Sequence, residues 1–206
     1  MDRVPVRVKI CGVRRLADAE AAVAAGADFL GLNFHPPSPR YLAPEAAAEL
    51  AAALPGVALV GVFVDLPRGE VERIAALVGL TALQFSGHED PAYCAGWAWR
   101  TVKTLHLAPG TDAAALAAGY ATDYLMADAS VPGLMGGTGV ALDSALTAGL
   151  PAERLFVAGG LRPETVAEVV RRVRPYAVDV ASGVESRPGE KDHAKLQEFI
   201  RRAKAA

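Results

Sequence analysis

The strongest constraint on the fold of this chain is a regular alternation of strand-like and helix-like segments along its whole length. Eight short β-branched or apolar runs predict strands, and the Ala-rich stretches between them predict helices. In the stretch that begins at Val71, apolar residues recur at Ile74, Ala75 and Val78, which gives a helix one apolar face. The expected strands are Val4–Ile10, Asp28–Phe34, Val57–Val64, Thr81–Phe85, Thr101–Leu105, Asp123–Met126, Leu155–Val157 and Tyr176–Val180.

This alternation predicts an α/β fold with a parallel sheet and helical crossovers. Eight strand–helix units favour closure of the sheet into a single (β/α)8 TIM barrel, near the lower size limit of that fold at 206 residues. An open, doubly wound sheet is the alternative that periodicity alone leaves in place. No linker rich in Pro, Gly or Ser divides the sequence, so we expect one domain over residues 1–206.

The composition limits the classes of function. Apolar residues make up 52% of the chain and charged residues 21%, which is typical of a soluble globular protein. The net charge is −2 and the basic residues are scattered, so we expect no nucleic-acid partner. No apolar run is long enough to span a membrane and the N-terminus lacks the features of a secretory signal, which favours a cytoplasmic protein without a membrane partner. The two cysteines belong to no CxxC or Cys/His cluster, so neither zinc nor a disulfide is expected.

Polar and glycine-rich residues gather where the expected strands end, which is where a barrel of this kind carries its chemistry. Two glycine-containing turns, Gly159-Gly160 and Ser182-Gly183, follow the last two expected strands, and Pro163 after the first turn is expected in the first turn of a helix. Because glycine allows backbone N–H groups to approach an anion closely, these turns predict a phosphate site. Taken alone, either turn could be purely structural.

Other residues near strand ends are candidates for catalysis or binding. Cys11 could act as a base or nucleophile, or could be a small buried apolar residue. Asp128 could be a general acid if an apolar setting keeps its carboxyl protonated, or could cap a helix or bind a loop. Arg40 could grip a carboxylate by two parallel hydrogen bonds, or could be a solvated surface charge. The run Gly136–Gly139 could close over a ligand or be a plain loop, and Cys94 is expected to be structural.

Taken together, these segments resemble the phosphoribosylanthranilate isomerases of tryptophan biosynthesis over the whole chain. The segments that carry the resemblance are Val8-Lys9-Ile10-Cys11-Gly12, Gly31-Leu32-Asn33-Phe34, Pro36 with Ser38-Pro39-Arg40-Tyr41, Val60–Val64, Leu83-Gln84, Gly136–Gly139, Gly159–Glu164, Val178–Glu185, Pro188-Gly189 and Lys191-Asp192. Each segment is weak evidence alone, but their shared order and spacing is specific.

The resemblance implies an Amadori rearrangement of N-(5′-phosphoribosyl)anthranilate without cofactor or metal. It implies that Asp128 is the general acid on the furanose ring oxygen and that Cys11 is the general base at C2′. Arg40 would hold the anthranilate carboxylate, and Asp179 would accept hydrogen bonds from ribose hydroxyls. The phosphate would be held by Gly159, Gly160, Ser182 and Gly183, with the backbone of Gly137 closing over it. The expected partner is therefore a small phosphorylated substrate, and the chain would act as a monomer or homodimer.

The sequence departs from the family pattern at Phe85-Ser86, where Leu-His is usual, so a role for that histidine cannot be transferred. His35 stands where an aromatic residue is common, and Ala127 and Ala181 are smaller than usual. Two other functions were weighed. A pentulose-phosphate epimerase would need His and Asp metal ligands at several strand ends, which the histidines at 35, 88, 106 and 193 do not provide. A non-catalytic barrel that binds a phosphorylated ligand would keep the glycine turns but have no use for a thiol and a carboxyl at the barrel mouth.

Overall fold

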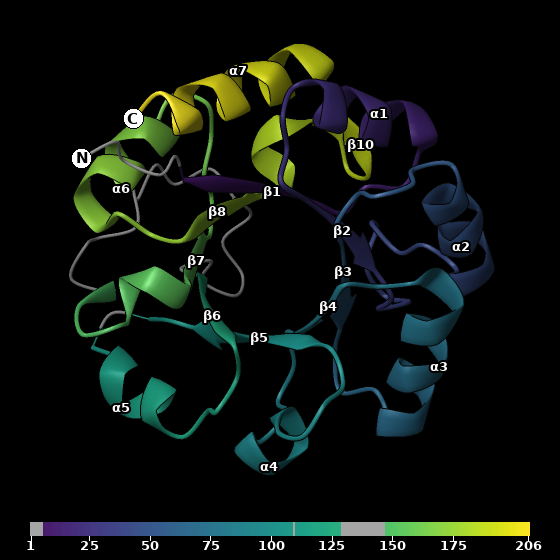
Figure 1. Cartoon of the computed structure of the whole chain (residues 1–206). Coiled ribbons are helices and arrows are strands. Elements are labelled where there is room, and N and C mark those ends of the chain that lie inside the picture. Colours follow the sequence, from purple (N-terminus) through teal and green to yellow (C-terminus); the bar gives the residue numbers. More distant parts are fainter. Residues whose placement is uncertain (1–5, 109, 129–146) are drawn as a thin grey trace.

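The computed structural model describes residues 6–108, 110–128 and 147–206, and within them eight parallel strands form a closed barrel. Each strand pairs with the next in the sequence, and β8 pairs with β1 to complete the ring (Figure 1). The strands are β1 (Arg7–Cys11), β2 (Phe29–Asn33), β3 (Leu59–Phe63), β4 (Ala82–Phe85), β5 (Arg100–His106), β6 (Tyr124–Asp128), β7 (Leu155–Ala158) and β8 (Ala177–Val180). The prediction of a (β/α)8 barrel rather than an open sheet is confirmed.

Helices surround the barrel as an outer ring (Figure 1). They are α1 (Leu16–Ala24), α2 (Pro44–Ala52), α3 (Arg68–Val78), α4 (Pro91–Cys94), α5 (Ala113–Ala118), α6 (Val166–Val173) and α7 (His193–Lys204), with short 3-10 helices η2 (Ala152–Arg154) and η3 (Ser182–Val184). A small hairpin of β9 (Glu185–Arg187) and β10 (Glu190–Lys191) follows η3. No helix in the described part of the chain is long and apolar enough to cross a membrane.

Two expectations differ in detail from the structure. The first strand was expected from Val4 but begins at Arg7, and residues 1–5 lie outside the described residues. Pro163 was expected in the first turn of a helix, but α6 begins only at Val166. The carbonyl of Arg162 accepts hydrogen bonds from the N–H groups of both Thr165 and Val166, so Pro163 lies in a tight turn that precedes the helix.

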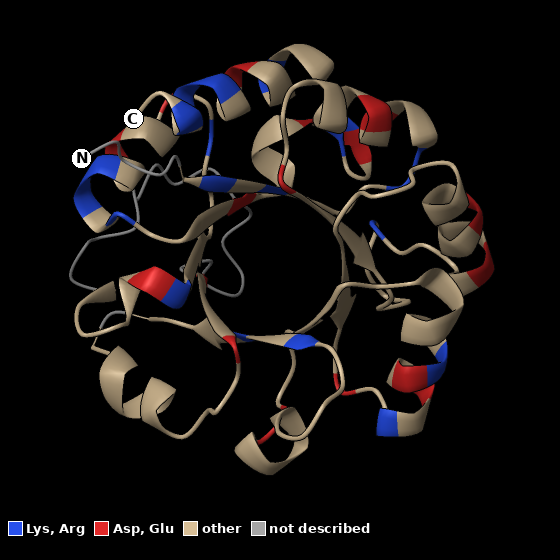
Figure 2. Ribbon diagram, viewed as in Figure 1, with Lys and Arg blue, Asp and Glu red and all other residues tan. Residues whose placement is uncertain are grey.

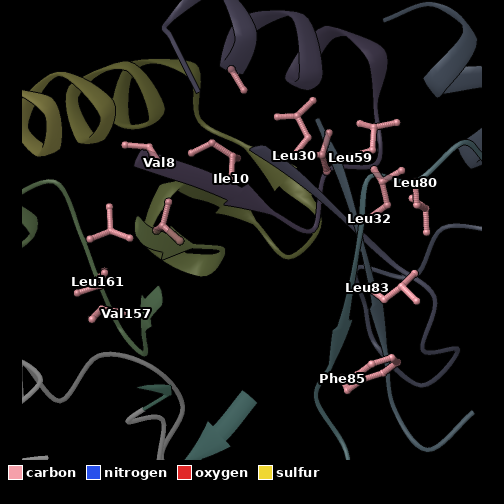
Figure 3. Packing of buried hydrophobic residues seen from close by; sticks show 14 of the residues in the cluster. Val8, Ile10, Leu30, Leu32, Leu59, Leu80, Leu83, Phe85, Val157 and Leu161 are labelled. Carbon is pink, nitrogen blue, oxygen red and sulfur yellow. The ribbon is translucent and has the colours of Figure 1, made fainter. Parts of the chain in front are cut away.

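Side chains alternate between the two faces of each strand, as the strand geometry requires. On β1, Val8 and Ile10 face outward and join the large core between barrel and helices, where Leu30 of the next strand also packs (Figure 3). Lys9 and Cys11 take the opposite positions and so point into the barrel. On β1 the outer face therefore contributes to the large hydrophobic core, and the inner face carries the polar Lys9 and Cys11.

A second apolar cluster fills the amino-terminal half of the barrel interior. It contains Val102, Met126, Phe156, Ala158 and Ala177, packed against Phe29, Tyr124 and Tyr176. The rings of Tyr124 and Tyr176 lie 4.7 Å apart, and those of Phe29 and Phe156 lie 5.7 Å apart. Because aromatic rings block this half of the interior, a ligand can reach the inward-facing polar groups only from the carboxyl ends of the strands.

The first and last units of the barrel are joined by buried polar contacts as well as by strand pairing. Asp18 on α1 is fully buried, and its carboxylate binds Arg15, the Nε2 of His193 at 2.9 Å and the backbone N–H of Lys191 at 3.3 Å. Most charged residues otherwise lie on the outer helices, while a few lie on the barrel strands (Figure 2). The charged groups on the strands therefore need a specific explanation, because burial of a charge is costly unless it is paired.

Candidate active site

A cavity of about 230 Å³ opens at the carboxyl ends of β6, β7 and β8. Its walls are Arg40, Asp128, residues 158–161 and residues 179–183. The sequence predicted most of these as site residues, and the structure brings them together. Two other hollows, of about 310 and 360 Å³, are lined by neither Asp128 nor the two glycine turns, and the first lies at the amino-terminal end of the barrel. The chemistry of this fold belongs to the carboxyl end, and the cavity of about 230 Å³ holds the carboxyl and both glycine turns there, so it is the candidate site.

Cys11 ends β1 at the barrel mouth, where the residue as a whole is partly exposed. The neighbouring Gly31 on β2 gives the thiol its space, because a Cβ built there would lie 2.9 Å from Sγ of Cys11 and 3.0 Å from Nζ of Lys9. Burial raises the pKa of the Cys11 thiol, and this outweighs the opposing effect of the Lys9 and Lys191 ammonium groups. The two lysines thus increase the fraction of thiolate above what burial alone would leave.

Lys9 and Asp179 form a buried ion pair across the junction of β1 and β8, with Nζ to Oδ1 at 2.8 Å. Burial alone would lower the pKa of Lys9, but the nearby Asp179 and Cys11 offset it and the pKa is raised. Lys9 is therefore a charged group beneath the thiol and beside the cavity. This role of Lys9 was not predicted from the sequence, although a lysine two positions before Cys11 in an apolar strand shares its face and could have indicated it.

Asp128 is the last residue of β6 and lies half-buried on the wall of the cavity. Pairing of β6 with β5 and β7 fixes its backbone, since Asp128 is in register with His106 on one side and Ala158 on the other. Asp128 thus ends the sixth strand, as predicted from the sequence, and its role as general acid stays a prediction.

Arg40 lies on the wall of the cavity, but its guanidinium already grips a carboxylate within the chain. Nε and Nη2 donate to Oε1 and Oε2 of Glu185 at 2.8 and 2.7 Å. The Nε–Nη2 edge of Arg40 is therefore occupied by Glu185, and the expected role of Arg40 at a substrate carboxylate stays a prediction. Within the described residues, Nη1 makes no hydrogen bond, so the remaining edge is the one that can bind a ligand. The paired carboxylate raises the pKa of Arg40, so it stays charged.

Gly12 supports the stem of Arg40. It adopts a φ of +71°, and a Cβ built there would lie 2.5 Å from Cδ of Arg40. Glycine is therefore needed both for the backbone conformation and for the close passage of the arginine. The result is that Arg40, from the loop after β2, lies directly over the residue that follows Cys11.

Glu185 and Lys191 form a second buried pair beside the first, with Nζ to Oε1 at 3.1 Å. The same Nζ donates to the carbonyl oxygens of Cys11 at 2.6 Å and of Ala181 at 3.2 Å. Burial tends to raise the pKa of Glu185, but Arg40 and Lys191 outweigh it and the pKa is lowered; burial lowers the pKa of Lys191. The sequence analysis quoted both residues as parts of motifs and gave them no role.

The two glycine turns lie against each other as well as against the cavity. Gly159 and Gly160 have φ of +94° and +67°, which favour glycine. A Cβ at Gly183 would overlap the carbonyl oxygen of Leu161, so residue 183 must be glycine for the two turns to approach. Ser182 begins η3 on the same wall. Gly137 and the run 136–139 lie outside the described residues.

The described residues contain no group of three or more His, Cys, Asp or Glu that could hold a metal ion. Cys94 is buried at the end of α4, as expected, and burial raises its pKa to about 11. Ser86, where the resembled family usually has histidine, hydrogen-bonds with Gln84 at 3.0 Å and Thr104 at 2.9 Å. Ser86 is therefore part of a hydrogen-bonded group of side chains from β4 and β5.

Comparison with known proteins shows the family of the chain. A family model described as N-(5'phosphoribosyl)anthranilate (PRA) isomerase matches residues 8–202. The N-(5'-phosphoribosyl)anthranilate isomerase of Myxococcus xanthus (strain DK1622) is 47% identical over 207 residues, covering 97% of each chain. The phosphoribosyl anthranilate isomerase from Thermotoga maritima superposes with a TM-score of 0.89 at 36% identity, over 98% of this chain and 100% of that one.

A further solved structure is a phosphoribosyl anthranilate isomerase in complex with reduced 1-(o-carboxyphenylamino)-1-deoxyribulose 5-phosphate. It superposes with a TM-score of 0.84 at 34% identity, over 98% of this chain and 100% of that one. A family match over nearly the whole chain, with full-length relatives above 30% identity, leaves one assignment. The chain belongs to the N-(5'-phosphoribosyl)anthranilate isomerase family, the isomerases of tryptophan biosynthesis.

Proposed function

We propose that this chain converts N-(5′-phosphoribosyl)anthranilate to 1-(2-carboxyphenylamino)-1-deoxyribulose 5-phosphate, without a cofactor, using Cys11 as general base and Asp128 as general acid. The observation that carries the proposal is a carboxyl at the end of β6 that lines one cavity with two glycine turns and Arg40, together with a thiol at the end of β1 in the same barrel mouth. The reaction needs a proton donor, a base and sites for two anions, and these groups supply one of each kind.

The proposed steps begin with proton transfer from Asp128 to the furanose ring oxygen. The bond from C1′ to that oxygen breaks, and the nitrogen lone pair forms a Schiff base with C1′. Cys11 as thiolate then removes the proton from C2′, and the electrons of that C–H bond flow to the nitrogen to give an enolamine. The enolamine tautomerises to the ketone as its C2′ hydroxyl loses a proton and C1′ gains one, so the product is an isomer of the substrate and no net oxidation occurs. Proton exchange then returns the Cys11 thiol to thiolate and the Asp128 carboxylate to its acid form.

Two positive charges near Cys11 partly offset the burial that raises the pKa of its thiol. Lys9 and Lys191 both favour the thiolate, and both are buried, so their fields are weakly screened by solvent. A thiolate is a far better base than a serine hydroxyl at neutral pH, so the identity of this residue matters more than its volume.

The remaining groups suit the two ends of the substrate. The turns at Gly159-Gly160 and Ser182-Gly183 would hold the phosphate, and Gly137 would contribute from outside the described residues. The free edge of Arg40 would bind the anthranilate carboxylate. Asp179, whose Oδ1 is held by Lys9, would accept hydrogen bonds from ribose hydroxyls. A single domain, a cytoplasmic location, a monomer or homodimer and the absence of a nucleic-acid partner stay predictions.

The test uses Cys11→Ser and Asp128→Asn, with Cys94→Ser as the matched control. Substrate is generated from anthranilate, phosphoribosyl pyrophosphate and the upstream transferase, and turnover is followed as loss of substrate fluorescence. Loss of a general base or acid should lower kcat by at least ~10²-fold. KM should change little in Asp128→Asn, because proton transfer belongs to the transition state.

Cys94→Ser should retain wild-type kcat, since that thiol lies away from the cavity. Near-normal kcat in either Cys11→Ser or Asp128→Asn, with circular dichroism showing a folded barrel, would exclude the assigned roles. Binding of substrate by the wild-type protein without any turnover would instead identify a non-catalytic barrel.

A further inference from the structure

Glu185 has no part in the steps above, yet it is buried against the group that would bind the substrate carboxylate. We propose that Glu185 is a positioning residue that holds Arg40 with its Nη1/Nη2 edge turned to the substrate carboxylate, so that it acts through orientation rather than through charge. This inference rests on the proposed function for the identity of the carboxylate.

The geometry of the pair leaves one orientation for the guanidinium. The group is planar, and Glu185 binds two of its nitrogens, which fixes both the plane and the rotation within the plane. The stem of Arg40 is confined at the same time by its contact with Gly12. The side chain of Glu185 is only 4% exposed and that of Arg40 is 23% exposed, so the carboxylate lies behind the arginine and away from solvent.

Glu185 is itself held by the hairpin on which it lies. Its Oε1 accepts from Nζ of Lys191 at 3.1 Å and from the backbone N–H of Gly189 at 3.3 Å. Lys191 in turn binds the carbonyl oxygens of Cys11 and Ala181. The cluster therefore connects three parts of the proposed site. These are Arg40, which would bind the substrate carboxylate, the proposed base Cys11, and Ala181, which leads into the Ser182 turn.

The charges of the cluster allow an experiment to distinguish two effects of Glu185, its orientation of Arg40 and its influence on the electrostatic attraction between Arg40 and an anion. Arg40 and Lys191 carry two positive charges and Glu185 one negative charge, so the cluster has a net charge of +1. If Arg40 bound its ligand only through charge, removal of the negative neighbour would strengthen binding of an anion. If Glu185 orients Arg40, the same removal weakens binding of a carboxylate that must meet the guanidinium edge. The two roles predict effects of opposite sign.

The experiment compares the wild type with Glu185→Gln and with Glu198→Gln. Glu198 is a matched control because it binds Arg201 and Arg202 on α7 and does not line the cavity. Calorimetry gives dissociation constants for reduced 1-(o-carboxyphenylamino)-1-deoxyribulose 5-phosphate, which carries both anions, and for inorganic phosphate. We expect Glu185→Gln to raise the dissociation constant of the first ligand roughly 10-fold or more and not to raise that of inorganic phosphate. Glu198→Gln should leave both dissociation constants unchanged.

A double-mutant cycle shows whether Glu185 acts through Arg40. In an Arg40→Ala background, Glu185→Gln should have no further effect on the dissociation constant of the two-anion ligand. Tighter binding in the single variant, equal weakening of both ligands, or full additivity in the cycle would each overturn the proposal. Because binding is measured without turnover, an inactive wild-type protein would refute the proposed function and still leave this comparison decisive.

The substitution could also destabilise the barrel, because it leaves two buried cations without their partner. The double variant Glu185→Gln/Lys191→Met keeps the cluster at a net charge of +1 and so avoids the excess of buried positive charge. It should bind the two-anion ligand as weakly as Glu185→Gln does. The single variant Lys191→Met retains the Arg40–Glu185 pair and should lose less affinity for this ligand. Wild-type affinity in the folded double variant would contradict the proposal.

Discussion

The buried ion pair between Lys103 and Glu89 gives a sharp test of how the outer side of the barrel is stabilised. Lys103 lies on β5, and its Nζ donates to Oε2 of Glu89 at 2.7 Å and to the carbonyl of Gly87 at 2.8 Å. The carboxylate also accepts the backbone N–H groups of Asp65 and Gly87, each at 2.9 Å. The pair therefore joins β5 to the loops that follow β3 and β4.

The two side chains are 3% and 2% exposed, so Lys103→Met would leave a buried carboxylate without its cation. Breaking such a pair from one side costs about 3–5 kcal/mol of unfolding free energy. In a chain of this size each kcal/mol corresponds to roughly 2–4 °C in Tm, so we expect Tm to fall by roughly 6–20 °C. The double variant Lys103→Met/Glu89→Gln removes both charges and should be more stable than Lys103→Met alone.

The measurement is urea unfolding followed by circular dichroism, with thermal scans beside it. Arg73→Met is the control, because Arg73 binds Glu70 on the exposed face of α3 and such surface pairs contribute about 0–1 kcal/mol. The reasoning is refuted if Lys103→Met loses no more stability than Arg73→Met. It is also refuted if the double variant is less stable than Lys103→Met, because the cost would then not arise from the unpaired charge.

The remaining predictions concern the site. The rate of alkylation of Cys11 by iodoacetamide should rise with pH, and the midpoint of this rise should lie above the ordinary thiol pKa, because burial raises the pKa and the thiolate is the reactive form. Lys9→Met should move the midpoint to higher pH. An unchanged midpoint would contradict the role given to Lys9. Gly12→Ala should cost about 1–2 kcal/mol from its left-handed φ and should raise KM by displacing Arg40, which steady-state kinetics would show. Gly183→Ala should weaken inhibition by inorganic phosphate, because its Cβ would push the two glycine turns apart; an unaltered inhibition constant would count against the phosphate site.

The fold could be predicted closely from the sequence because its signals are local. Each strand is a short apolar run, and a stripe such as that from Val71 to Val78 becomes the buried face of α3. The predicted strand boundaries differ from the observed ones by a few residues, since a run of apolar letters does not show where pairing stops. The same rule, that chemistry lies where strands end, placed Cys11, Asp128 and Asp179 correctly around the barrel mouth.

The pairing of the charged groups could not be predicted in the same way. Arg40 and Glu185 are separated by 145 residues, and Lys9 and Asp179 by 170. Nothing in a single sequence says which distant charges meet, because that depends on barrel closure and on the register between β8 and β1. The bound edge of Arg40 is the clearest case, since the sequence predicts a guanidinium at the site and only the structure shows which of its edges is taken.

Closure of the barrel at β1 and β8 also determines when, during folding, a working site can exist. The contacts that organise it join the two ends of the chain, with Lys191 to the Cys11 carbonyl spanning 180 residues and His193 to Asp18 spanning 175. Contacts of such sequence separation form late, because a long loop must close before they are made. A nascent chain emerging from the ribosome carries its thiol and Lys9 from the first dozen residues, yet that thiol gains its second buried lysine neighbour, Lys191, only when the final hairpin docks.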